Sequence, residues 1–210
     1  VDPLALIEGL SEDNAIEGYD GGLFSRDKYI LPDLIEDLWV ARDRAKANSN
    51  EVLSQAIKII MNSFYGVLGT IGCRFFDSRL VSSITKRGRE IIIQSKEYIE
   101  DKGYQVIYGD TDSVFVLLGN VQKDKIASIG DCIAKDLNNW WNEKLEKEHS
   151  VTSFLEIQFE AHYQKFLIPT IRGSDAGSKK RYAGLLADNK VEFKGLETVR
   201  SDWSPLAREF

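Results

Sequence analysis

Apolar side chains recur at helical spacing in several stretches of the chain. Residues 31 to about 47 carry one every three or four positions, with a proline near the start, and this pattern predicts a helix. A second helix is expected from 51 to about 67, a third from about 82 to 102, and a long fourth one from the turn at 119–120 to about 148. Only ANSN separates the first two, so we expect them to fold back as an antiparallel hairpin.

Short runs rich in β-branched and aromatic residues predict strands between and after these helices. QVIYGDTDSVFVLL, residues 105–118, indicates two buried strands around Asp-Thr-Asp-Ser, and the stretches 154–170 and 179–196 supply further strands. The acidic, glycine-rich residues 8–22 predict a solvated loop, and CRFFDSRL, residues 73–80, a loop or short strand. This order favours an α+β fold: an antiparallel sheet backed by helices, with the two-helix hairpin inserted and projecting from it.

Composition adds limits to this outline. With 43% hydrophobic residues the chain can build a core, and no apolar run approaches the roughly 20 residues that span a bilayer. Cys73 and Cys132 are far apart, which is typical of reduced cysteines in a cytosolic protein. The net charge is −6, but residues 1–40 hold ten acidic and two basic side chains, so the remainder is at +2. Its basic clusters, ARDRAK and SKKRY, leave a nucleic-acid partner open.

Two carboxylates, Asp110 and Asp112, stand where a tight hairpin turn would normally carry Asn-Gly or Asp-Gly. Two like charges this close repel each other unless a cation intervenes. Oxygen ligands without nearby His or Cys select Mg²⁺ or Mn²⁺ rather than Zn²⁺. An inert, solvated hairpin tip is the alternative, but the apolar flanks favour a metal site.

Residues 58–66, KIIMNSFYG, place a cation, an amide and a phenol on one stripe of the second helix: Lys58, Asn62 and Tyr65. An anionic ligand with a flat ring requires such groups. Arg42 and Lys46 on the preceding helix could point the same way, although taken alone they suit an ordinary solvated face. The run Lys179–Tyr182, between glycines, would allow close approach to a phosphate chain.

Together these segments resemble the family B DNA polymerases and, within that family, the bacterial polymerase II group. KIIMNSFYG is similar to the fingers motif, YGDTDS to the metal-binding palm motif and KKRYAG to the motif that grips the primer–template duplex. FKGLETVRSDW resembles the segment that leads into the thumb, while GCRFFDSRLVSSIT and PTIRGSDAGSKKRYAG point to the polymerase II group.

The resemblance implies a role for each of these positions in template-dependent nucleotidyl transfer with two Mg²⁺ ions, for which Mn²⁺ can substitute. Asp112 is the expected ligand of both ions, Asp110 a supporting carboxylate and Glu160 a further one, with Glu156 as the neighbour it could be confused with. Lys58 and Asn62 are expected to contact the triphosphate of the incoming nucleotide, and Arg42 and Lys46 its γ-phosphate end. Tyr65 and Gly66 are expected to lie against the nascent base pair. The DNA-binding set is Thr111, Lys179, Lys180, Arg181 and Tyr182.

The same resemblance sets the expected domains: 1–30 leads from palm to fingers, 31–68 is the fingers hairpin, 69–202 the palm and 203–210 the start of the thumb. The palm motif Asp-x-x-Ser-Leu-Tyr-Pro and the exonuclease motifs are absent, and the chain begins with Val1, so we expect an inactive fragment of a longer enzyme. The expected partners are primer–template DNA, dNTPs and a sliding clamp bound through a C-terminal region outside this sequence, with no membrane. The expected setting is DNA repair or replication restart in a bacterial cytoplasm, at the nucleoid.

Two other classes of protein remain as alternatives. Metal-dependent glycosyltransferases also use Asp-x-Asp, but that interpretation leaves KIIMNSFYG and KKRY unexplained. A polymerase-like module without activity, used only to bind DNA, would have lost its carboxylates or Lys58, and both are intact.

Overall fold

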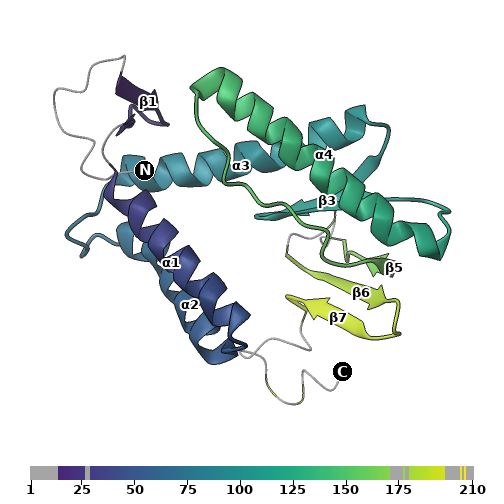
Figure 1. Ribbon diagram of the computed structural model, residues 1–210. Coiled ribbons are helices and arrows are strands. Elements are labelled where there is room, and N and C mark those ends of the chain that lie inside the picture. Colours follow the sequence, from purple (N-terminus) through teal and green to yellow (C-terminus); the bar gives the residue numbers. More distant parts are fainter. Residues whose placement is uncertain are drawn as a thin grey trace. The chain divides into compact units, whose positions relative to one another are not determined.

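The computed structural model describes residues 14–26, 29–170, 177, 180–196, 204 and 206. The chain forms two compact units, Val1–Ile91 and Ile92–Phe210, that divide inside one helix. The first contains β1 (Ala15–Glu17), β2 (Leu23–Ser25), α1 (Ile30–Ala47), α2 (Glu51–Leu68) and the start of α3 (Ser78–Asp101). The second contains the rest of α3, β3 (Gln105–Asp110), β4 (Ser113–Leu117), α4 (Lys123–His149), β5 (Tyr163–Leu167), β6 (Tyr182–Leu186) and β7 (Val191–Lys194). Helices and antiparallel strands confirm the α+β class (Figure 1).

The helical hairpin of the first unit is confirmed. Figure 1 shows α1 and α2 side by side, and only three residues separate them. Ser49 turns the chain with a left-handed φ of 54°, and the Asn50 side chain caps α2 by accepting a hydrogen bond from the Leu53 amide at 3.0 Å. Their local sequence therefore fixes where both helices end.

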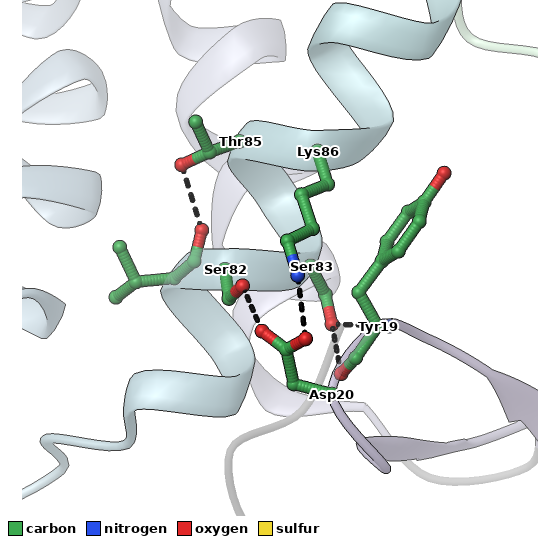
Figure 2. Close-up of polar contacts among 7 residues, drawn as sticks. Tyr19, Asp20, Ser82, Ser83, Thr85 and Lys86 are labelled. Carbon is green, nitrogen blue, oxygen red and sulfur yellow. Dashed lines mark hydrogen bonds and ion pairs between the residues drawn. The ribbon is translucent and has the colours of Figure 1, made fainter.

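The turn between β1 and β2 is docked on α3, so the prediction of a solvated loop is wrong for residues 14–22; residues 8–13 lie outside the described part. The Tyr19 amide donates to the Ser83 hydroxyl at 2.8 Å, and the Tyr19 hydroxyl donates to Glu90 at 2.7 Å. Asp20 pairs with Lys86 at 2.5 Å and accepts a hydrogen bond from the Ser82 hydroxyl (Figure 2). These partners stand more than sixty residues along the chain, beyond the reach of a local pattern.

The core of the first unit joins the β1–β2 hairpin to the helices. Phe24, Leu68 and Leu80 are buried together, and Leu80 is fully enclosed. α3 begins at Ser78, four residues before the predicted start, because the Asp77 carboxylate accepts the Arg79 amide at 2.8 Å and caps the first turn. Residues 73–80 thus form a loop followed by helix, without a strand.

In the second unit α3 packs against α4. Ile99 and Leu137 are buried, and the Trp141 indole N–H donates to the buried Ser95 hydroxyl at 2.9 Å. Because the buried indole N–H has an acceptor, it carries no desolvation penalty for an unpaired donor. None of the helices in the described part of the chain is long and apolar enough to cross a membrane.

The described strands form three antiparallel sheets, where the sequence predicted one: β1–β2, β3–β4 and β5–β6–β7. Residues 154–162, predicted as strand, alternate between exposed and half-buried from 154 to 160 but belong to no ladder. The Asn138 side-chain amide on α4 donates a hydrogen bond to the Ile157 carbonyl at 2.8 Å and accepts one from the Ile157 amide at 2.9 Å. A neighbouring strand would otherwise pair with these backbone groups.

Candidate functional site

The turn between β3 and β4 consists of two residues, Thr111 and Asp112. Asp110 pairs with Ser113 in the ladder, and the Asp112 amide donates to the Asp110 carbonyl at 2.5 Å. Thr111 has a φ of 40°, a conformation that is rare for a β-branched residue and that glycine would adopt without strain. Strain of this kind persists where surrounding contacts hold it and is often found at functional sites.

The two aspartates flank this strained residue, with Asp110 half-buried and Asp112 exposed. Asp110 accepts a hydrogen bond from the Thr111 hydroxyl at 3.0 Å, and Asp112 accepts one from the Ser113 hydroxyl at 3.3 Å. No salt bridge in the part of the chain that the structure describes involves either carboxylate. Two anionic groups with only local hydroxyl partners retain oxygen atoms that can bind a hard cation.

Glu160 lies on the extended segment before β5 and is exposed. Burial raises the pKa of Tyr182, and the neighbouring charges of Glu192, Asp110 and Glu160 raise it further. Asp110 and Glu160 therefore act on the same phenol, whereas Glu156 accepts a hydrogen bond from Gln158 at 2.7 Å. Within the described ranges, no three His, Cys, Asp or Glu side chains form a group that could hold one metal ion. Glu160 as a third ligand stays a prediction.

Five aromatic rings connect the β3–β4 hairpin to the β5–β6–β7 sheet: Tyr108, Phe115, Tyr163, Phe166 and Tyr182. Phe115 lies 4.8 Å from Phe166 and 5.3 Å from Tyr182, measured between ring centroids. Burial, and then the hydrogen bond to Glu192 at 2.8 Å, raises the pKa of Tyr163. The strands that lead into and out of the Asp-Thr-Asp turn are therefore packed, through Tyr108 and Phe115, against the rings of the neighbouring sheet.

Of the basic motif expected to grip DNA, Lys180, Arg181 and Tyr182 are described, and Lys179 lies outside the described residues. Lys180 is exposed at the turn before β6, and Tyr182 is half-buried among the rings. Tyr182 therefore supports the fold at this point, and a direct contact with DNA stays a prediction.

The predicted stripe on α2 is present in the first unit. Lys58, Asn62 and Tyr65 are all exposed, while Ile57 and Leu68 are the buried residues of the helix. Gly66 follows in open space, since a side chain added there would meet no atom within 4 Å. The stripe is thus accessible to a ligand over two helical turns.

Thr85 on α3 holds the phenol of Tyr65 and was missed by sequence reasoning. The two hydroxyl oxygens lie 2.6 Å apart, and the Thr85 hydroxyl donates its own proton to the Val81 carbonyl at 2.8 Å. Tyr65 is consequently the donor in the first bond. No sequence signal pairs residues 20 positions apart on two helices.

The two cations predicted on α1 differ in their surroundings. Lys46 is exposed and lies 3.6 Å from Asp43 on its own helix. Arg42 is half-buried, and its Nε has no hydrogen-bond partner among the described residues. A buried donor without a partner is costly unless an acceptor arrives, so Arg42 has the stronger case for an anion contact.

Comparisons with known proteins agree with these motifs. A family model described as DNA polymerase family B matches residues 24–210, and the chain belongs to that family. It is 52% identical, over its whole length, to the DNA polymerase II of Escherichia coli (strain K12). It is also 34% identical, over 83% of its length, to the DNA polymerase delta catalytic subunit of Arabidopsis thaliana, and 30% identical, over 85%, to the alpha catalytic subunit of Sterkiella nova. The chain spans 28%, 17% and 12% of these relatives.

Proposed function

We propose that this chain supplies the palm and fingers of a longer DNA-directed DNA polymerase, which adds nucleotides to a primer 3′-hydroxyl under the direction of a template. The observation that carries the proposal is the pair of carboxylates, Asp110 and Asp112, held without cationic partners at a strained two-residue turn. Membership of family B supports the proposal and argues against the glycosyltransferase alternative.

The donor set of this turn fits Mg²⁺, with Mn²⁺ as a substitute. Asp112 and Asp110 would hold the ions, with Glu160 as a further ligand. Bound there, the metal would activate the primer hydroxyl and neutralise charge on the triphosphate. Two carboxylates are a sparse ligand set for two ions that repel each other, so we expect the 210-residue chain alone to bind Mg²⁺ weakly and to extend no primer.

The remaining residues divide between the two substrates. In this proposal Lys58 and Asn62 contact the triphosphate, Arg42 and Lys46 its γ-phosphate end, and Tyr65 and Gly66 the nascent base pair. The duplex contacts are Thr111, Lys179, Lys180, Arg181 and Tyr182. The cellular role in this proposal is repair or replication restart at the bacterial nucleoid, with a sliding clamp as a partner.

Asp112→Asn in the full-length polymerase tests the metal assignment. The substitution keeps the shape of the side chain and removes its charge, so we expect primer extension to be abolished with Mg²⁺ and with Mn²⁺, while primer–template affinity stays within about twofold. Asp101→Asn, at the exposed end of α3, is the matched control and should extend primers normally. Extension that survives in the Asp112→Asn enzyme would refute the assignment. Absent extension in the unsubstituted full-length protein would favour the inactive DNA-binding module.

A further inference from the structure

Lys180 adopts a backbone conformation that is unusual for a residue with a side chain. Its φ is 61°, in the left-handed region, where the β-carbon crowds the main chain. The residue is exposed at the turn that leads into β6, so packing of its own side chain cannot hold it there. Contacts to its backbone must do so.

Two such contacts grip Lys180 from opposite ends of its backbone. Its amide donates a hydrogen bond to the Tyr108 hydroxyl at 2.8 Å. Its carbonyl oxygen lies against Gly195, where an added β-carbon would stand only 2.0 Å from that oxygen. Gly195 itself has a φ of 61°. The conformation of Lys180 is therefore held by the Tyr108 hydroxyl at its amide, and it needs a glycine at position 195 to leave room for its carbonyl oxygen.

Tyr108 is well placed to hold this turn. It stands on β3 two residues before Asp110, and its ring packs 5.3 Å from Phe115 and 6.0 Å from Tyr182, measured between centroids. Packing fixes the ring, so the hydroxyl presents a stationary acceptor to Lys180. One strand therefore carries both a carboxylate of the candidate metal site and the support of the basic turn.

We propose that Tyr108 is a positioning residue for DNA binding, which holds Lys180 in its left-handed conformation and so directs the lysine side chain toward a phosphate of the primer–template duplex. The inference rests on the proposed role of Lys180 in duplex binding. Without the hydroxyl, the backbone of Lys180 relaxes toward negative φ, and the direction of its side chain changes.

Tyr108→Phe in the full-length polymerase tests this directly, because it removes one oxygen atom and keeps the ring. We expect Kd for primer–template DNA to rise about fivefold at moderate salt, the equivalent of one lost hydrogen bond. The slope of log K against log salt should shrink by up to about one, since a phosphate contact is weakened. The dependence on dNTP at saturating DNA should stay unchanged.

Tyr163→Phe is the matched control. Tyr163 belongs to the same ring cluster, but its hydroxyl donates to Glu192, whereas the Lys180 amide donates to Tyr108. We expect a wild-type salt slope for Tyr163→Phe. If the aromatic cluster were merely loosened by loss of a hydroxyl, both Tyr108→Phe and Tyr163→Phe would weaken DNA binding. Gly195→Ala, whose added β-carbon would push on the Lys180 carbonyl, should likewise weaken DNA binding and reduce the salt slope, and its Tm is measured alongside.

A double-mutant cycle with Lys180→Ala separates this inference from the proposed function. If Tyr108 acts through Lys180, Tyr108→Phe has little further effect once the lysine side chain is gone. Additive losses of DNA affinity in the double variant would overturn the inference and leave the duplex role of Lys180 intact. The same conclusion would follow if Tyr108→Phe had a wild-type Kd and salt slope while Lys180→Ala bound DNA more weakly. Wild-type DNA binding by Lys180→Ala would overturn both.

Discussion

Replacement of Lys58 by alanine should weaken use of the incoming nucleotide and leave the fold intact. Lys58 is exposed in the middle of α2, and within the described residues it makes no hydrogen bond or ion pair. Alanine is at least as good a helix former as lysine, so the free energy of unfolding should change by less than about 0.5 kcal/mol. Any large effect of Lys58→Ala must then come from a ligand.

The size of that effect follows from the chemistry of the contact. A hydrogen bond from an ammonium group to a phosphate contributes about 1.5–3 kcal/mol, which corresponds to a roughly 10- to 150-fold loss of kcat/KM for dNTP. The assay is single-nucleotide primer extension by the full-length enzyme at saturating primer–template DNA, with the dNTP concentration varied. Kd for DNA, measured in the absence of dNTP, should stay within about twofold.

Lys96→Ala provides the control for removal of an exposed helical lysine. Lys96 lies on α3, 3.7 Å from Glu100, and belongs to no proposed site, so its kcat/KM should equal that of the wild type. Unchanged dependence on dNTP together with weaker DNA binding in the Lys58→Ala enzyme would contradict the reasoning and move Lys58 to the duplex side.

Two further predictions concern the first unit. Leu80→Ala should lower the free energy of unfolding by about 2–5 kcal/mol in urea titrations, because Leu80 is fully enclosed, and a loss below about 1 kcal/mol would show that the cavity collapses. The hydrogen bond from Lys86 and, to a smaller extent, that from Ser82 lower the pKa of Asp20. The stability that this carboxylate adds is therefore present above about pH 4, the ordinary pKa of an aspartate, and is lost as the pH falls through the folded pKa. Asp20→Asn should therefore differ most from the wild type in its urea midpoint at neutral pH, and the difference should shrink as the pH is lowered through the folded pKa. A difference that stays constant with pH would exclude this role of Asp20.

The elements set by local pattern could be predicted from the sequence. The apolar spacing of residues 31–47 and 51–67 and the Asn50 cap are properties of neighbouring residues, and α1 and α2 end within one residue of their expected limits. The hairpin around Asp-Thr-Asp could be found for the same reason. Tyr108 could also have been found, since it stands on the same face of β3 as Asp110, two residues away.

The elements set by distant partners could not be predicted. An acidic, glycine-rich segment suggests a solvated loop, and only the fold brings Ser83 to the amide of Tyr19. The apolar run after 154 suggests a strand, but Asn138 occupies the backbone of Ile157. The left-handed Lys180 likewise depends on Gly195, fifteen positions further along. In each case the deciding contact is made by a residue remote in sequence.

The position of the boundary between the two units bears on how the chain could be divided. Proteases cut at exposed, locally unfolded loops, yet Ile91 and Ile92 stand in the middle of the continuous helix α3. A cut there would leave residues 78–91 at the C-terminal end of the first unit and residues 92–101 at the N-terminal end of the second. Isolated helices of such length are marginally stable in water. The buried side chains Leu80 and Ile99 belong to opposite halves, so each severed unit would have to hold a frayed helix against its own core. Limited proteolysis should therefore spare residues 78–101, and the two units should resist production as separate stable proteins.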